Sequence, residues 1–477
     1  MVALPSHADA KALLPVPHWA GHERELACWD LCWKLAFQNI MNPKPGTGFV
    51  SPFIDTAFNG CVFMWDSVIM LQFARYGRRA FDFQATLDNF YAKQHPDGFI
   101  CREIDWSDGG DRYERHNPVS TGPNILAWCE ADHYRHTGDA VRISQVLPAL
   151  IGFHRWMRQY RTWPDGSYWS CGWSSGMDNA PRVGPGSNIC FHHDWMAWVD
   201  TTGQQMLSCR KILELSNAAW WDQPTIDMAP EALALKEFLN SECWNEKLGS
   251  YTDRTRRGVS DVLTLAGWWA VLAGATDSRR FRRMRDLVAD PEHFFRPHPL
   301  PFLSASHPAY SPHGAYARGG VWAPNVACVL AALRNGGDPA LAHLLARRHV
   351  EAVARVAHDT GTIWENYAPD RIAAAHPSKK DFVGWSGWGP IAGLLEHVFG
   401  LDPHAPQGLL VWDCRLTEEH GVERYPFGEK GTLNLYCAAR DSQESEPSIR
   451  VDSDVQVLVE VRWAGGTKTI VAGPAAY

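Results

Sequence analysis

The stretch Asn335-Gly336-Gly337-Asp338 separates two segments with helical periodicity, at about 321–335 and 338–357. Glycine ends helices well because it tolerates the left-handed backbone region, and aspartate caps the first turn of a following helix. Thr137-Gly138-Asp139 stands in the same way between segments at about 122–137 and 140–160. Joints this short hold consecutive helices side by side, so the sequence predicts helical hairpins.

The same periodicity extends over most of the chain, with short joints alternating with long loops. The loops, at about 41–62, 93–122, 160–194, 288–321 and 357–384, are rich in Trp, Gly, Pro, Asp and His. Six hairpins with recurring long loops predict a mainly α fold, an (α/α)6 barrel whose loops gather around a central pocket. An open superhelical array is the competing architecture, but no fixed repeat length favours it. The twelve predicted helices lie near 22–41, 62–76, 80–93, 122–137, 140–160, 194–216, 230–243, 258–273, 277–288, 321–335, 338–357 and 384–399.

After about residue 401 the pattern changes to short apolar or alternating runs with turn residues between them. Strands are predicted at 408–412, 432–438, 455–463 and 467–471, with Gly465-Gly466 as a hairpin turn. We therefore expect a catalytic helical domain at 1–400 and a small antiparallel β segment at 401–477 that packs on the barrel.

Composition excludes several classes of protein. The net charge of −8 and the lack of a Lys/Arg block argue against nucleic-acid binding. No apolar run approaches the roughly 18 residues that a membrane span needs. Residues 1–14 lack a basic stretch followed by an apolar one, so we expect a cytoplasmic protein with its 12 cysteines reduced. Oligomeric state is left open, a homo-oligomer included.

Two loop carboxyl groups stand among aromatic and small residues. Asp178 follows Trp173, Gly176 and Met177, and such apolar surroundings raise the pKa of a carboxyl group, as a general acid requires. The alternative is a loop aspartate that forms an Asx turn and pairs with Arg182. Glu365 lies between Trp364 and Tyr367 in another long loop; alone, it reads more readily as a hydrogen-bonded surface residue.

Together the two carboxyl groups favour carbohydrate chemistry, because a ring of hairpins would bring both loops to one mouth. The chain has 23 tryptophans, and indole faces stack on the apolar faces of sugar rings.

The run 172–176 matches the letters of a serine-hydrolase nucleophile elbow, but no strand is predicted before it. We read His192-His193-Asp194 as a helix start with Asp194 near the cap. Cys28 and Cys32 could share a metal, but no second ligand pair has matching spacing, so we expect none.

Several of these motifs resemble the family of trehalases and processing α-glucosidase I (glycoside hydrolase families 37 and 63). The run 175–182, Ser-Gly-Met-Asp-Asn-Ala-Pro-Arg, resembles the acid motif of that family, and Trp364-Glu365-Asn366-Tyr367 resembles its base motif. Met64-Trp65-Asp66-Ser67 and 96–103 are similar to its early substrate-binding segments. Gly384-Trp385-Ser386-Gly387 is similar to its entry into the last helix. The motifs follow the family's order over about residues 50–400.

The resemblance implies an (α/α)6 barrel that hydrolyses α-glycosides with inversion and without a metal or organic cofactor. Asp178 would then be the general acid and Glu365 the general base, with their carboxyl groups roughly 6.5–9.5 Å apart to admit a water molecule. It also implies a set of sugar-contacting positions: Trp65, Asp66, Arg102, Glu103, Asn117, Trp173, Arg182, Trp322, Tyr367 and Trp385.

Two departures from the family leave the substrate open. The glycine-rich run that trehalases carry before the last helix is replaced by 373–380, and the large N-terminal β domain of processing glucosidases is missing. We therefore predict an exo-acting enzyme on a small saccharide or oligosaccharide, an α-glucoside being favoured, without assigning trehalose, linkage or aglycone. Two alternatives are an (α/α)6 sugar epimerase or isomerase and a non-catalytic glycan-binding protein.

Overall fold

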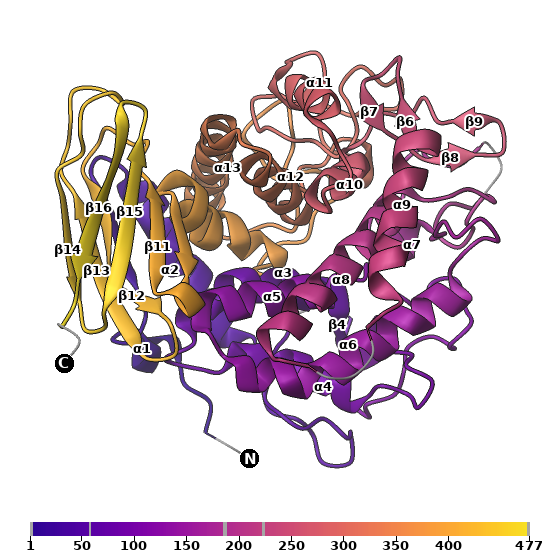
Figure 1. Cartoon of the computed structure of the whole chain (residues 1–477), viewed down its shortest axis with the longest axis horizontal. Helices are drawn as coiled ribbons and strands as arrows, with labels where there is room; N and C mark the ends of the chain where they lie inside the picture. The colour runs from indigo at the N-terminus through magenta and orange to yellow at the C-terminus, as the bar shows by residue number, and fades with distance from the viewer. Residues whose placement is uncertain (1–2, 57–58, 185–187, 222–224, 475–477) are drawn as a thin grey trace.

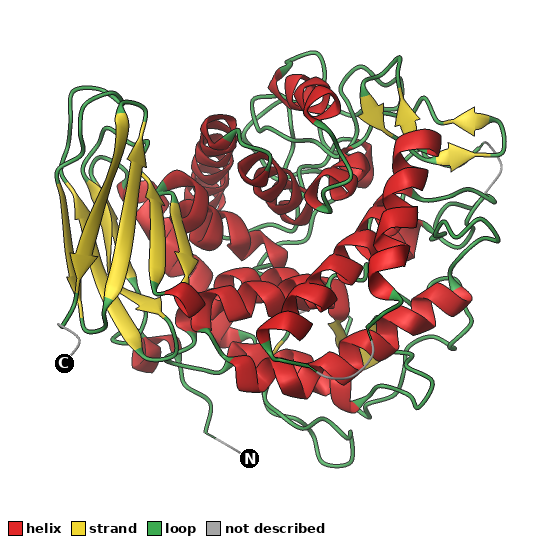
Figure 2. Ribbon diagram, in the orientation of Figure 1, coloured by secondary structure: helices red, strands yellow, loops and turns green. Residues whose placement is uncertain are grey.

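The computed structural model describes residues 3–56, 59–184, 188–221 and 225–474. Helices occupy most of the molecule, and two packed sheets stand on one side of them, at the left of Figures 1 and 2. The chain is therefore mainly helical with a smaller β part, as the sequence predicts. None of the helices in the described ranges is long and apolar enough to cross a membrane.

Six helices follow one another around a closed ring. Each contacts the next, and the last contacts the first. Around the centre of Figure 1 they appear as α3, α5, α8, α10 and α12, with the ring completed by the last helical segment. The six are α3 (Met64–Ala74), α5 (Leu126–Thr137), α8 (Val199–Ala218), α10 (Trp268–Leu272), α12 (Ala323–Asn335) and the joined pair η5 (Trp385–Trp388) and η6 (Gly389–Val398), the latter a π-helix.

A second set of helices alternates with these along the chain and lies outside the ring. Five of them pack directly on inner helices: α2 on η6, α4 on α3, α6 and α9 on α8, and α13 on α12 and η6. Also, α2 packs on α13. The outer helices are α2 (Glu23–Gln38), α4 (Thr86–Ala92), α6 (Ala140–Tyr160), α9 (Met228–Glu242), α11 (Ser278–Ala289) and α13 (Pro339–Thr360).

The short joints have the cap chemistry that their sequences predict. Gly138 ends α5 in the left-handed region at φ 79°, and the Asp139 carboxylate accepts from the backbone N–H of Arg142 at 2.9 Å. Asp338 caps α13 in the same way, accepting from the backbone N–H of Leu341 at 3.0 Å. These caps confirm both joints as hairpin turns.

Two helix starts differ from the sequence-based expectation. The start of α8 is at Val199, so placing Asp194 near its cap was wrong; Asp194 has φ 50°, and its carboxylate accepts from the backbone N–H of Gly184 at 3.0 Å. The segment expected to be helical from 258 turns first through the short hairpin β8 (Arg254–Thr255) and β9 (Gly258–Val259). Gly258, at φ 124°, favours that turn over a helix.

The β part consists of two four-stranded sheets, in the orders β1-β12-β13-β14 and β10-β11-β15-β16. All four predicted strands and the turn between the last two are present. Other features were not predicted: the strands β10, β12 and β14, the parallel pairing of β11 with β15, and the inclusion in the first sheet of β1 from near the N-terminus. The strands are β1 (Val16–Trp19), β10 (Leu401–His404), β11 (Leu409–Asp413), β12 (His420–Phe427), β13 (Gly431–Cys437), β14 (Ile449–Ser453), β15 (Val457–Trp463) and β16 (Gly466–Ala472).

The inner helices α8 and α10 approach each other closely at Gly203. A Cβ atom on Gly203 would lie 2.8 Å from the backbone nitrogen of Ala270 and 2.9 Å from the carbonyl carbon of Trp269. Backbone atoms cannot swing aside as a side chain can. The glycine therefore sets how near the two helices can come.

Gly203→Ala should lower the free energy of unfolding by about 1–3 kcal/mol, although alanine is the better helix former. The measurement is the thermal midpoint at one fixed scan rate. Gly152→Ala in α6 is the matched control, because its nearest neighbour is the flexible Gln94 side chain at 3.1 Å. Equal midpoints for the two variants would contradict this account of the α8–α10 crossing.

Candidate active site

A cavity of about 200 Å³ lies where the starts of α3 and η5 meet the long loops. Each of the five predicted long loops contributes at least one lining residue, so their convergence on one mouth is confirmed. Eight residues singled out from the sequence are among those that line it. The lining residues are Asn59, Phe63, Trp65, Asp66, Arg102, Glu103, Tyr113, Trp173, Gly176, Asp178, Tyr316, Glu365, Phe382 and Trp385.

Asp178 enters this cavity from a tight turn after the one-turn helix α7 (Gly172–Ser175). The turn needs Gly176, which has φ 75° and passes so close to Trp65 that a Cβ atom would lie 3.3 Å from the indole nitrogen. Burial raises the pKa of Asp178 to about 6; Arg102 opposes the shift, and the negative charge of Glu365 adds to it. The carboxyl group thus holds its proton at mildly acidic pH.

Hydrogen bonds hold both the side chain and the backbone carbonyl of Glu365. Its carboxylate accepts from the backbone N–H of Lys379 at 3.2 Å and from the Tyr316 hydroxyl at 3.4 Å. Its backbone carbonyl accepts from the Trp385 indole at 2.7 Å and from the Ser386 hydroxyl at 3.1 Å. Burial raises the pKa of Glu365, and the two donors to its carboxylate partly offset that shift.

Asn179 ties the loop of Asp178 to the residue that contacts Glu365. Its amide donates to the carbonyl of Ala315 at 3.0 Å, and its side-chain oxygen accepts from the backbone N–H of Ala317 at 2.9 Å. Between these two bonds stands Tyr316, which with Ala315 has a positive φ, 62° and 41°. The two hydrogen bonds of Asn179 thus stabilise a left-handed turn that non-glycine residues seldom adopt. Sequence analysis missed Tyr316, for which only its place in a long loop was a signal.

The remaining polar groups of the cavity form a connected set. Arg102 pairs with Glu103 at 2.6 Å and donates to the carbonyls of Val119 and Trp173 at 2.8 and 3.1 Å. Asp66 is 5% exposed, and burial raises its pKa well above the ordinary range, with further contributions from neighbouring carboxylates. The cavity thus holds several carboxyl groups, which accept hydrogen bonds when ionised and can also donate them when protonated. Such a set suits a ligand with many hydroxyl groups.

Four of the expected sugar-contacting residues do not line the cavity. Arg182 is buried between Asp200 and Asp253, at 2.6 and 2.5 Å, so the alternative in which it pairs with Asp178 is excluded. Asn117 supports its own loop, its side chain accepting from the Val119 backbone N–H at 3.1 Å.

The other two of the four are aromatic residues behind the wall of the cavity. Trp322 is 1% exposed and packs edge-on against Tyr316 and Trp385. Tyr367 is 2% exposed, and its hydroxyl accepts from the backbone N–H of Trp364 at 3.3 Å. Both therefore position lining residues from behind.

Comparison with known proteins assigns this chain to a family. The model of the mannosylglycerate hydrolase MGH1-like glycoside hydrolase domain matches residues 62–386, which span the whole inner ring up to η5. The chain belongs to this family. It is a glycoside hydrolase, of the family 63 type, and the resemblance drawn from its motifs is confirmed.

Named relatives of this glycoside hydrolase are distant. An uncharacterized protein of Borreliella burgdorferi is 24% identical over 377 residues, covering 76% of this chain and 77% of that protein. A probable mannosyl-oligosaccharide glucosidase of Schizosaccharomyces pombe is 24% identical over 279 residues, covering 51% of this chain but only 33% of the yeast protein.

Solved structures share the fold at lower identity. The mannosylglycerate hydrolase of family 63 from Thermus thermophilus, in complex with glucose, has a TM-score of 0.60 and 20% identity over 77% of this chain and 99% of that one. Neutral trehalase from Saccharomyces cerevisiae has a TM-score of 0.58 and 14% identity, covering 75% and 76%. A family 78 rhamnosidase from a Bacillus species has a TM-score of 0.67 and 16% identity. The superposition covers 97% of this chain and 43% of the rhamnosidase.

Removing the Arg182 charge should damage the fold. Arg182→Met leaves Asp200 and Asp253 buried without their partner, which costs about 3–5 kcal/mol of unfolding free energy. Chemical denaturation of this glycoside hydrolase, followed by tryptophan fluorescence, measures the loss; Arg371→Met, at an exposed loop position, is the control. A variant as stable as the control, with only its KM raised, would instead support the original substrate-binding role.

Proposed function

We propose that this glycoside hydrolase is an inverting, exo-acting α-glycosidase, with Asp178 as general acid and Glu365 as general base. The observation that carries the proposal is the meeting of two buried carboxyl groups, from loops 187 residues apart, in one cavity where each has a raised pKa. The ring of six inner helices with alternating outer helices supports an (α/α)6 barrel as the scaffold. The family membership supports hydrolysis of a glycosidic bond.

Asp178 donates its proton to the glycosidic oxygen as the bond to the anomeric carbon breaks. A carboxyl group with a pKa near 6 is still protonated in mildly acidic solution, and its conjugate base is stable enough to form during the reaction. Arg102 stabilises that developing charge, since it opposes the raised pKa of Asp178. Burial therefore supplies the proton and the arginine eases its release.

Glu365 removes a proton from a water molecule whose oxygen attacks the anomeric carbon from the opposite face. The backbone N–H of Lys379 and the Tyr316 hydroxyl fix the direction of the carboxylate. Direct attack by water inverts the anomeric centre in one step, with no covalent sugar–enzyme bond. The proton gained by Glu365 and the one lost by Asp178 return through solvent before the next turnover.

Aromatic and polar side chains around the two carboxyl groups suit a single terminal sugar. Trp65, Trp173 and Trp385 offer ring faces or edges to its apolar surfaces, and Asp66 with Arg102 can bind its hydroxyl groups. At the inner end, Trp65 packs on Trp269, with ring centroids 6.0 Å apart. A pocket closed there favours exo action over binding within a long chain.

The substrate class is a small saccharide or oligosaccharide with a terminal α-linked sugar, glucose or mannose. This range is supported by the activities named for two relatives, a mannosylglycerate hydrolase and a probable mannosyl-oligosaccharide glucosidase. An epimerase would normally use a histidine pair for proton transfer, but the lining residues of the described cavity include no histidine. The buried pair His298 and His349, 2.8 Å apart, packs on Tyr367 behind the wall.

Asp178→Asn and Glu365→Gln should each lower kcat by about a hundred- to ten-thousandfold, because each removes one proton-transfer group. The assay is hydrolysis of a panel of α-linked glucosides and mannosides, with mannosylglycerate and trehalose included. Glu429→Gln, at an exposed site in the β part, is the matched control and should keep full activity. Turnover close to wild type in either cavity variant would rule out this pair of roles.

The pH dependence follows from the raised pKa of Asp178. The acid works only when protonated, so kcat/KM should fall about tenfold per pH unit above roughly pH 6. On the acidic side the rate falls as Glu365 gains a proton, in a pH range above that of an ordinary glutamate. Initial rates between pH 3 and 9 measure the profile. A rate that keeps rising through pH 8 would contradict Asp178 as the acid.

A further inference from the structure

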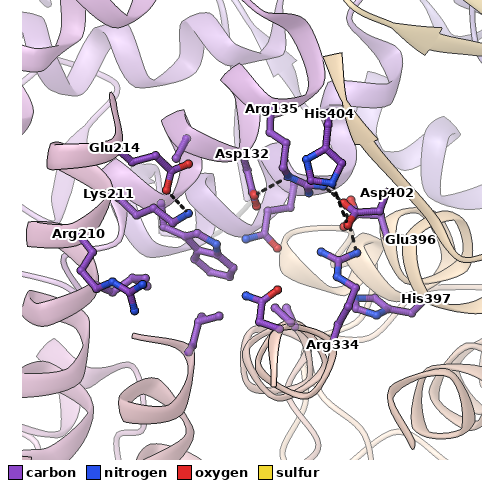
Figure 3. Close-up of a pocket in the computed structure, with 18 of the residues that line it drawn as sticks. Asp132, Arg135, Arg210, Lys211, Glu214, Arg334, Glu396, His397, Asp402 and His404 are labelled. Atoms are coloured by element: carbon purple, nitrogen blue, oxygen red, sulfur yellow. Dashed lines mark hydrogen bonds and ion pairs between the residues drawn. The ribbon is translucent and has the colours of Figure 1, made fainter. Parts of the chain in front are cut away.

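A second pocket, of about 440 Å³, lies at the other end of the helix ring. Its walls come from α3, α5, α8, α10, α12 and η6. Gln72, near the end of α3, lines it, whereas Trp65 and Asp66 at the start of that helix line the catalytic cavity. Figure 3 shows charged side chains on two sides of it, Arg210 and Lys211 from α8 facing Arg334 from α12. The proposed reaction gives this pocket no role.

Two acidic residues on one side of this second pocket already have cationic partners. Asp132 pairs with Arg75 at 3.6 Å and with Arg135 at 3.5 Å. Asp402, from the start of the β part, pairs with Arg135 and lies 3.8 Å from Nη1 of Arg334 (Figure 3). Three guanidinium groups therefore face two carboxylates on this side.

The other two acidic residues of the lining are also engaged. Glu214 pairs with Lys211 at 2.8 Å, and Glu396 accepts from the Tyr76 hydroxyl at 2.8 Å. Among the residues described for the lining of this pocket, every carboxylate therefore already has a hydrogen-bond or ion-pair partner. A cation entering it would have to displace an existing partner.

Hydrogen-bond donors, in contrast, are left over. Within the described ranges, Nε and Nη1 of Arg334 are buried without a hydrogen-bond acceptor, and so is Nε2 of Gln72, whose side chain is 3% exposed and lines the pocket. Nη1 of Arg75, behind Asp132, is in the same condition. Buried polar groups are almost always satisfied, so unsatisfied ones point to a missing partner. All of these atoms are donors, so that partner must be an acceptor.

Two further features fit a small anionic ligand. Trp128 contributes an apolar indole to the wall, and Arg210, whose Nη1 donates to the carbonyl of Ala273, is exposed at the rim. Burial lowers the pKa of His397 well below its ordinary value and that of His404 to about 4. Both are uncharged at neutral pH, so arginine and lysine supply the positive charge there.

We propose that this second pocket binds a small anion rich in acceptor oxygens, a phosphate or carboxylate group, through Arg334 and Gln72 at its floor and Arg210 at its rim. Guanidinium groups suit such ligands because they donate paired hydrogen bonds to two oxygens. The site is separate from the catalytic cavity: Trp269 stands between them, packing on Trp65 on one side and on Trp128 on the other.

The test is calorimetric titration of the full-length enzyme with inorganic phosphate, and in a second arm with citrate, at low ionic strength. We expect saturable binding of at least one of them, weakened about tenfold or more in both Arg334→Gln and Arg210→Gln. Arg257→Gln, an exposed arginine of the β8–β9 turn, is the matched control and should bind as wild type. Because Arg210 is at the rim, its variant decides the outcome if Arg334→Gln fails to fold.

Enzyme kinetics separate this site from the catalytic one. In the absence of anion, Arg210→Gln should hydrolyse substrate like wild type, and phosphate should not compete with substrate in the wild-type enzyme. Absence of binding of both anions at about 10 mM would overturn the proposal, as would binding that both variants retain. Competition with substrate would place the anion in the catalytic cavity and would overturn it equally.

Discussion

The inner helices α3 and η5 begin at the same end of a closed ring, and the rest of the molecule depends on that constraint. The long loops that join the hairpins must then converge at that end, and side chains far apart in sequence share one cavity. Burial in the cavity removes water from its carboxyl groups, which raises their pKa values. Close packing at Gly203 and the cap at Asp338 help to hold this arrangement, which brings Asp178, the general acid that we propose, into the cavity.

The ends of the ring have opposite characters. At the end with the proposed active site, carboxyl groups are in excess, and burial raises the pKa values of Asp66 and Asp178. At the other end, arginines are in excess of free acceptors, and donors such as Nε of Arg334 are left over. Trp269 divides the two along the axis. The same scaffold can therefore hold a neutral sugar at one end and, as we propose, an anion at the other.

Much of this was predictable from sequence because the signals are local. Helical periodicity and glycine–aspartate joints such as Gly138-Asp139 specify the hairpins, and the order of the motifs specifies which loop has Asp178 and which has Glu365. Local sequence patterns cannot predict which distant residue a side chain will contact. Arg182 adjoins the acid motif in sequence, yet it points away to Asp200. Tyr316 stands in no motif, and it reaches Glu365 only because Asn179 clamps its turn. The pairing of β1 with β12 is equally non-local.

In the mechanism that we propose, two carboxyl groups, a buried acid and an oriented base, act on opposite faces of one α-linked sugar. Proton NMR of the anomeric signals during the first minutes of hydrolysis tests it most directly, before mutarotation mixes the products. Inversion would release the β anomer of the sugar first, with the α anomer appearing only later. Release of the α anomer first would mean retention, and it would contradict direct attack by a water molecule held at Glu365.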